Sequence, residues 1–129
     1  MSKLDDFLAL KDVSDITDTI AVKIGGKTLN LKIRAMSEAE HSEFQKRALA
    51  IGKKNVQFDK GKFDSLMIPT CIVEPNFNNS EFLEKAKCHT AWEFLTKKIP
   101  AGVLSDISAK IQELSGFESI EEEIEEAKN

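Results

Sequence analysis

Hydrophobic and polar residues alternate in two short runs near the N-terminus. Every second position of these runs is apolar: Ile20, Val22 and Ile24, then Leu29, Leu31 and Ile33. Gly25 and Gly26 separate the runs, and a Gly-Gly pair is typical of a two-residue hairpin loop because both positions need a positive φ. The pattern predicts a β-hairpin over 20–34, with Val22 opposite Leu29 and the apolar side chains on one face. Two strands are marginal alone, so we expect helices to cover this face.

A capping box marks the start of the first predicted helix. The Ser37 side chain can accept a hydrogen bond from the amide of Glu40, while the Glu40 carboxylate reaches back. The apolar side of this helix would be Phe44, Ala48, Leu49 and Ile51. Gly52 would end the helix, and a loop over 52–62 would follow, with a short extended piece at 56–58.

Residues 63–74 are mostly apolar, which favours a buried central helix. Pro69 lies within this segment and cannot donate a backbone hydrogen bond, so it should kink the helix or restrict it to one side of the proline. Pro75 closes the segment. We therefore expect a helix over 63–74 whose geometry is constrained near Pro69.

Two further helices are expected in the last third of the chain. Asn78 or Asn79 can cap a single helix that continues to Leu95. Another helix begins at Pro100 or Ala101, and its apolar stripe is Val103, Leu104, Ile107, Ile111 and Leu114. Gly116 is a typical left-handed helix stop, and Phe117 is placed for the apolar contact that accompanies such a stop.

The charge of the chain is concentrated at its end. The formal net charge is −4, from 18 basic and 22 acidic residues. Residues 118–129 contain six Glu and one Lys, so the rest of the chain is nearly neutral. A near-neutral body offers no broad cationic face, which disfavours binding of nucleic acid.

Targeting and redox features indicate a soluble protein of the cytoplasm. No stretch approaches the ~20 apolar residues that span a bilayer. Residues 1–6 lack the apolar run of a secretory signal. Cys71 and Cys88 fit a reducing compartment, where they would be free thiols.

Candidate catalytic and metal-binding groups are few. His41 lies in an acidic first helical turn and is interpreted as a solvated surface residue. Cys88 and His89 are adjacent, but neighbours in a helix point about 100° apart, which disfavours a shared metal or a nucleophile pair. Residues 25–28 end in Lys-Thr, but a strand follows them rather than the helix that a phosphate-binding loop needs. We therefore expect no enzyme activity, no metal and no cofactor.

Two terminal segments carry candidate partner-binding residues, which are Leu4, Phe7 and Leu8 in the first and Phe117, Ile120 and Ile124 in the second. The first segment is a short amphipathic piece that either packs on the body as an ordinary helix or docks on a partner as a tethered peptide. The second is either a solvating acidic terminus or a segment that folds against another chain. Both alternatives stay open from the residues alone.

The C-terminal third resembles a known family. The pattern consists of Pro100, the helix with Leu104, Ile107, Ile111 and Leu114, then Ser115-Gly116-Phe117, and an acidic ending at 124–129 that reads Ile-Glu-Glu-Ala-Lys-Asn. This order is similar to that of the XkdN-like tail assembly chaperones of phages and PBSX-type prophages. The likeness extends upstream through the turn at 73–77 to the hairpin, and it is weaker before residue 20.

The resemblance implies a non-enzymatic role in building long phage tails. Members of the family are expected to shield the apolar helices of the tape measure protein and to help bring tail tube subunits to it. The resemblance also implies work in the bacterial host cytoplasm, absence from the finished virion and a longer product made by ribosomal frameshifting.

Together these observations predict an α+β fold, in which the hairpin packs on a bundle of about four to five helices. The expected organisation is a flexible N-terminal segment over 1–19, a single globular domain over 20–117 and a flexible acidic tail over 118–129. The expected partners are the tape measure and tail tube proteins, without membrane. The alternative function is a small helical regulator or nucleic-acid adaptor that uses Lys46, Arg47, Lys53 and Lys54.

Overall fold

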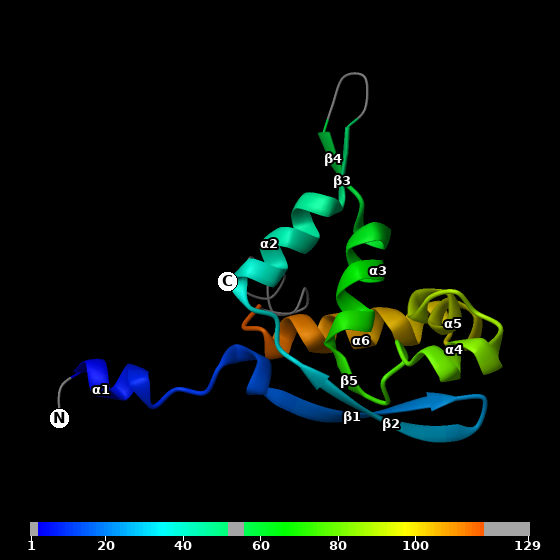
Figure 1. Cartoon of the computed structure of the whole chain (residues 1–129), viewed down its shortest axis with the longest axis horizontal. Coiled ribbons are helices and arrows are strands. Elements are labelled where there is room, and N and C mark those ends of the chain that lie inside the picture. The colour runs from blue at the N-terminus through cyan, green and yellow to red at the C-terminus, as the bar shows by residue number, and fades with distance from the viewer. Residues whose placement is uncertain (1–2, 52–55, 118–129) are drawn as a thin grey trace, which may run out of the picture.

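The computed structural model describes residues 3–51 and 56–117, and it confirms the α+β fold (Figure 1). The elements in chain order are α1 (Lys3–Leu8), the 3-10 helix η1 (Val13–Asp15), β1 (Thr17–Ile24), β2 (Lys27–Arg34), α2 (Glu38–Arg47), β3 (Leu49–Ile51), β4 (Val56–Phe58), α3 (Lys60–Cys71), β5 (Ile72–Glu74), α4 (Ser80–Ala86), α5 (Ala91–Lys98) and α6 (Ala101–Leu114). The tail predicted over 118–129 lies outside the described residues.

The first hairpin has the predicted register. β1 and β2 pair antiparallel with Val22 opposite Leu29, and the loop glycines, Gly25 and Gly26, have φ values of 56° and 81°. β1 begins at Thr17, so the first strand is three residues longer than predicted. The added residues pair with the far end of β2, which the alternation of apolar residues did not indicate.

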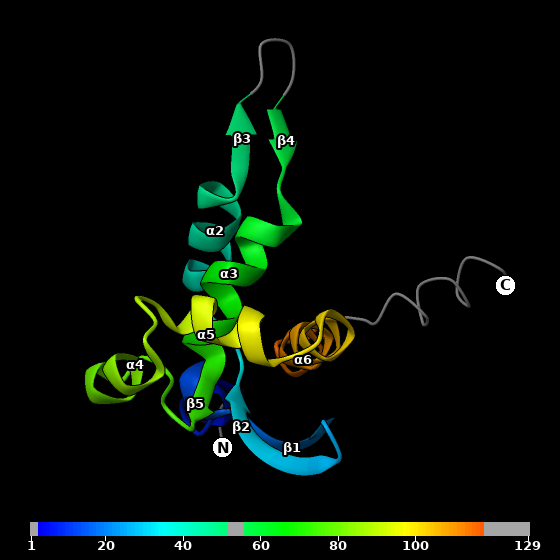
Figure 2. The same cartoon turned by 90° about the vertical axis from the view of Figure 1, so that its right-hand side faces the viewer.

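Helices cover one face of this hairpin (Figures 1 and 2). α6 contacts both β1 and β2, and α3 packs against α2, α5 and α6. The largest fully buried apolar side chains come from the sheet and these helices: Ile33, Met67, Ile68, Leu95, Ile107 and Ile111. The core therefore lies between the inner face of the sheet and helices α3, α5 and α6.

The helix that starts at Ser37 is shorter than predicted. Its capping box is present, with the Glu40 amide donating to Ser37 Oγ at 3.2 Å and the Ser37 amide donating to Glu40 Oε1 at 3.2 Å. The helix ends at Arg47 rather than at Gly52, so the prediction that Leu49 and Ile51 are helical is wrong. They belong to β3, which pairs with β4 in a second hairpin. Their spacing fits a helix equally well, and the cross-strand pairing decided between the two.

The central helix ends three residues earlier than predicted. α3 stops at Cys71 with Pro69 in its last turn, and β5 follows as the third strand of the sheet beside β2. The prediction of a helix to residue 74 is therefore wrong at its end. Ile72 and Val73 are β-branched, and Pro75 disfavours helical backbone at Glu74, so the edge of β2 can recruit them as a strand.

The single helix predicted from Asn79 to Leu95 is two helices. The Asn79 cap is confirmed, because its side chain accepts from the amide of Phe82. The chain then leaves the helix at Lys87, whose φ is 58°, and Thr90 caps α5 by accepting from the amide of Glu93. This break folds α4 back against α5.

The last helix follows the prediction. Pro100 precedes α6, and Gly116 has a φ of 98° after its end. The amide of Phe117 donates to the carbonyl of Gln112, and that of Gly116 donates to the carbonyl of Glu113. These two bonds form a Schellman motif, which satisfies carbonyls that the helix end would leave unpaired.

Candidate interaction surfaces

The largely apolar groove at the tip of the first hairpin is the first candidate surface. It has a volume of about 400 Å³ and lies between the hairpin and helices α4 and α5. We call it the aromatic groove and define it by Ile24, Leu29, Phe77, Phe82 and Phe94. The three phenylalanines pack together, with ring centroids 4.7 Å apart for Phe82 and Phe94 and 5.7 Å apart for Phe77 and Phe94. All three rings are half-buried, so each also presents a surface to solvent.

The rim of the aromatic groove is basic. Among the described residues that line it, Lys27 and Lys98 carry charge. Both side chains are exposed, and neither has an ion pair within 4.0 Å in the described part of the chain. An apolar floor with two cations at the rim suits a ligand that combines apolar side chains with carboxylates.

The N-terminal helix is a second candidate surface. Figure 1 shows α1 away from the body, joined to it by an extended segment. Leu4, Phe7 and Leu8 are 74%, 70% and 83% exposed, and no residue of this helix is buried. Residues at i, i+3 and i+4 share one helix face, so the three side chains form one apolar stripe. The structure therefore does not show the first alternative, in which this N-terminal helix packs on the body.

The second hairpin is a third candidate surface. β3 and β4 project from the body beyond α2 and α3 (Figures 1 and 2). Leu49, Val56 and Phe58 are 48%, 62% and 50% exposed. The hairpin is anchored at its base, where the Asp59 amide donates to the carbonyl of Ala48 at 2.8 Å. The Phe58 ring also lies 5.6 Å from that of Phe63.

An aromatic contact joins the end of α6 to α2. The ring of Phe117 lies 4.7 Å from His41, which in turn lies 5.7 Å from Phe63. The prediction of a solvated surface histidine is therefore wrong for His41, which is half-buried between two rings. The sequence around it is acidic, but the rings that cover it come from distant segments. Despite this contact, Phe117 is 43% exposed.

The predicted partner-binding residues occupy separate places. Leu4, Phe7 and Leu8 lie together on α1, whereas Phe117 follows the far end of α6. Ile120 and Ile124 lie outside the described residues. The aromatic groove and the second hairpin were not predicted as surfaces. The groove had one signal in the sequence, which is eight Phe with no Tyr, but Phe82 and Phe94 meet only because α4 folds back on α5.

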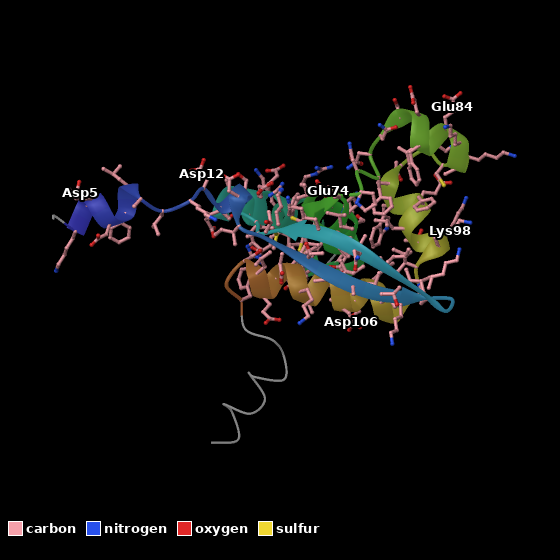
Figure 3. All side chains as sticks on the ribbon, turned by 90° about the horizontal axis from the view of Figure 1, so that it is seen from below. Asp5, Asp12, Glu74, Glu84, Lys98 and Asp106 are labelled. Carbon is pink, nitrogen blue, oxygen red and sulfur yellow. The ribbon has the colours of Figure 1, made fainter. Side chains whose placement is uncertain are left out.

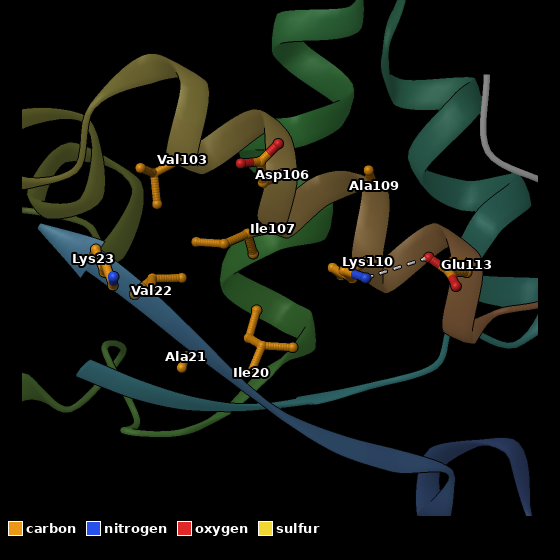
Figure 4. Close-up of a pocket in the computed structure, with 10 residues that line it drawn as sticks. All are labelled: Ile20, Ala21, Val22, Lys23, Val103, Asp106, Ile107, Ala109, Lys110 and Glu113. Atoms are coloured by element: carbon orange, nitrogen blue, oxygen red, sulfur yellow. Dashed lines mark ion pairs between the residues drawn. The ribbon is translucent and has the colours of Figure 1, made fainter. Parts of the chain in front are cut away.

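A second cavity, of about 410 Å³, lies between β1 and α6 (Figure 4). Its charged side chains carry both signs: Lys23, Asp106, Lys110 and Glu113. Lys110 and Glu113 form an ion pair at 3.8 Å, and both side chains are 59% exposed. Solvated charges of mixed sign give neither the desolvation nor the convergence that acid–base chemistry requires.

The cysteines and the remaining histidine are dispersed. Cys71 is buried, and burial raises the pKa of its thiol to about 11, which keeps it protonated and unreactive near neutral pH. Cys88 and His89 lie in the loop between α4 and α5 rather than in one helix, which corrects the expected placement. Within 3–51 and 56–117, no three His, Cys, Asp or Glu side chains are grouped so that they could hold a metal ion.

The Arg34–Glu40 pair links the sheet to α2. The Arg34 guanidinium donates two hydrogen bonds to the Glu40 carboxylate, at 2.9 Å and 2.8 Å. The hydrogen bond from Arg34 lowers the pKa of Glu40, and the same contact raises the pKa of Arg34. Both partners also take part in backbone contacts, because Arg34 donates to the carbonyl of Ala35 and Glu40 closes the capping box. The pair therefore has a structural role.

Comparison with known proteins decides the family. The model of the phage XkdN-like tail assembly chaperone protein matches residues 4–128, which is nearly the whole chain. This protein belongs to the XkdN-like tail assembly chaperone family. The match includes the first residues, where the resemblance was weak, and the tail beyond the described part.

The fold of this XkdN-like chaperone is also found in a solved structure. The crystal structure of the protein YqbN has a TM-score of 0.58 with it and is 17% identical in sequence. The similarity covers 79% of this chain and 87% of that chain. At this identity the likeness shows the shared fold alone. No curated protein matches the chain in sequence.

Two further expectations concern other kinds of partner. In the described portion of this XkdN-like chaperone, no helix is both long enough and apolar enough to cross a bilayer. Lys46 and Arg47, named for a nucleic-acid adaptor, are exposed in the last turn of α2. Lys53 and Lys54 lie outside the described residues.

Proposed function

We propose that this XkdN-like chaperone shields the tape measure protein and helps to recruit tail tube subunits during assembly of a long phage tail. It acts by binding rather than by catalysis. It works in the cytoplasm of the bacterial host and does not enter the mature virion. Family membership supports the general role, and the placement of apolar side chains supports the mode of action.

The observation that carries the proposal is the exposure of apolar side chains on segments that project from a completed core. Val56 and Phe58 are at least half exposed, whereas Ile33 and Ile107 are fully buried. Burial of apolar surface contributes about 25 cal/mol per Å², so such side chains favour contact with another apolar surface. A client with long apolar helices supplies that surface.

Client binding is assigned first to the second hairpin and to Phe117. Both sites present apolar groups that are tied to the body, since the hairpin is anchored at Asp59 and the Phe117 ring packs on His41. Ile120 and Ile124 also remain proposed partner-binding residues. Leu4, Phe7 and Leu8 remain proposed partner-binding residues of the N-terminal helix.

Co-expression with the tape measure and tail tube proteins tests the proposal. A tagged full-length chaperone should retain the tape measure protein in the soluble fraction and co-purify with it. Val56→Asp places a charge on the second hairpin at an exposed position and should weaken this co-purification several-fold, on the order of 1 kcal/mol or more. Lys62→Asp, at an exposed position of α3, is the matched control. Failure of the unaltered chaperone to bind either tail protein would refute the proposal.

The proposed role includes a longer product made by programmed frameshifting. Such a product would carry this domain followed by an extension, and it would join the client surface to further tail contacts. Mass spectrometry of an infected or induced culture should detect peptides that span the junction. Their absence, with peptides of residues 3–117 abundant, would count against a longer form.

A further inference from the structure

Two apolar surfaces lie unmatched at opposite ends of the molecule. Figure 3 shows Asp5 of α1 at one end and Lys98, at the rim of the aromatic groove, at the other. The stripe of Leu4, Phe7 and Leu8 is largely exposed, and Leu29 at the groove is 47% exposed. Each surface lacks a partner among the described residues.

The N-terminal helix needs a partner to be stable. It has six residues, and isolated helices shorter than about 12 residues are marginal in water. At its C-terminal end, the Ala9 amide donates to the carbonyl of Asp5 and the Leu10 amide donates to the carbonyl of Phe7. Packing of its apolar stripe on another surface would add stability.

The aromatic groove fits this helix in size and charge. Its volume of about 400 Å³ is at the lower end of the range for binding pockets, which suits a few anchoring side chains rather than a long helix. α1 has Asp5 and Asp6 in its first turn against a single cation, Lys3, so the helix is negative. The charged groove residues, Lys27 and Lys98, are both basic.

The helix lies far from the groove of its own chain (Figure 3). Ile16 is held beside the sheet because its carbonyl accepts from the Ala35 amide at 2.9 Å. From there β1 runs for eight residues, or roughly 26 Å, to the groove at its far end. From Leu8 to Val13 the chain spans at most about 18 Å, and η1 adds about 6 Å, so the connection would have to be fully extended to approach that groove. A second copy of the chain is therefore the occupant that the geometry favours.

We propose that α1 of one copy docks in the aromatic groove of a second copy. Phe7 and Leu8 anchor the helix against Phe82 and Phe94, and the acidic first turn faces Lys27 and Lys98. Reciprocal exchange of the two helices closes a symmetric dimer, in which each contact occurs twice. This self-association goes beyond the proposed client binding and does not depend on it.

Sedimentation velocity of the full-length chain over a range of concentrations tests the exchange. The unaltered protein should form a reversible dimer. Phe7→Asp with Leu8→Asp should weaken dimerisation by roughly a hundredfold, because two anchoring side chains are lost. Val56→Asp, an equally severe change at an exposed position of β4, should leave the dimer unchanged. An unaltered protein that stays monomeric up to about 1 mM, or a dimer that survives the double substitution, overturns the proposal.

Mixing two defective variants provides a sharper test. The variant with Phe7→Asp and Leu8→Asp keeps its groove, and Leu29→Asp spoils the groove but keeps α1. Each variant should be monomeric alone, and an equimolar mixture should form a heterodimer through the one intact pair. A mixture that stays monomeric contradicts docking of α1 in the groove.

Charge reversal supplies a second set of variants that leaves the groove floor intact. Lys27→Glu with Lys98→Glu should weaken the dimer about threefold to tenfold, and raised salt should shrink this difference. Asp5→Lys with Asp6→Lys should weaken it similarly, and mixing the two reversed chains should restore association. If Lys27→Glu with Lys98→Glu changes neither the strength of the dimer nor its salt dependence, the acidic first turn of α1 does not face these lysines and the proposed docking is overturned. Client co-purification by the groove variants, Leu29→Asp and Lys27→Glu with Lys98→Glu, separates this proposal from the proposed function, because these variants should still bind the tape measure protein.

Discussion

The two hairpins of this chaperone are built from similar residues but have different surroundings. In β1 and β2 the apolar face is covered by α6, and Leu31 and Ile33 are buried. In β4 the Phe58 ring contacts Phe63 of α3, but Val56 and Phe58 remain at least half exposed. Because a two-stranded ribbon is marginal in water, the first hairpin owes its stability to coverage and the second to its anchored base. The comparison shows that the same strand chemistry serves the core in one place and remains available for binding in the other.

The largest expected effect separates the two hairpins by stability. Ile33→Ala removes a fully buried side chain from β2 and should lower the free energy of unfolding by about 2–5 kcal/mol. Val56→Ala shortens a β-branched side chain on β4 that is 62% exposed and should cost less than about 0.5 kcal/mol. Urea denaturation followed by circular dichroism measures both. Similar losses in the two variants would mean that the second hairpin belongs to the cooperative core.

A smaller effect concerns the turn of the first hairpin. Gly26 has a φ of 81°, so Gly26→Ala places a side chain in left-handed backbone and should destabilise the protein by about 1–2 kcal/mol. Space is not the cause, because an added Cβ would meet nothing within 4 Å. Gly102→Ala, in the first turn of α6 and equally open, is the control and should be neutral or stabilising by up to about 1 kcal/mol. Thermal denaturation should therefore show a lower midpoint for Gly26→Ala and an unchanged or higher midpoint for Gly102→Ala.

The smallest effect concerns the junction between the two hairpins. Arg34 at the end of β2 holds Glu40 on α2, the helix that leads into β3, and this contact lowers the pKa of Glu40. Because the pKa of Glu40 is lower in the folded state, the ionised carboxylate stabilises the fold at pH values above 4.5, the ordinary pKa of a Glu. This stabilisation is lost as the pH falls through the lowered pKa. Glu40→Gln should lower the free energy of unfolding by about 1 kcal/mol near neutral pH. It should also make the loss of stability at acidic pH smaller than in the unaltered protein.

Urea midpoints of this variant between about pH 6 and about pH 3 test the junction. Glu43→Gln changes an exposed carboxyl on the same helix and serves as the control. It should follow the unaltered protein over the whole range. If Glu40→Gln also follows it, the pair adds nothing to the link between sheet and helix.

The two Schellman motifs show how far helix ends can be predicted from the sequence. At the end of α6 the left-handed position is Gly116, a residue that tolerates positive φ, and the end was predicted correctly. At the end of α4 the same pair of bonds forms, from the Lys87 amide to Glu84 and from the Cys88 amide to Leu83. Here the left-handed residue is Lys87, which gives no such signal, and the break between α4 and α5 was missed.

The interaction surfaces divide in the same way. The amphipathic stripe of α1 follows from local spacing, so Leu4, Phe7 and Leu8 were candidates from the sequence. The aromatic groove depends on Phe77, Phe82 and Phe94 meeting across a loop and two helices, which spacing along the chain cannot show. His41 illustrates the same limit, because its acidic neighbours in sequence predicted exposure and two rings from other segments cover it.

The sequence alone determined the features that depend on neighbouring residues: the register of the first hairpin, the caps at Ser37 and Asn79, and the limits of α6. The tertiary structure decided the features that depend on contacts between segments distant in the sequence. Residues 49–51 and 72–74 became strands because a partner strand was within reach, and hydrogen bonds between strands outweighed a weak helical preference. Which apolar side chains are buried was settled in the same way, since burial depends on the helix that covers a strand and not on the strand itself.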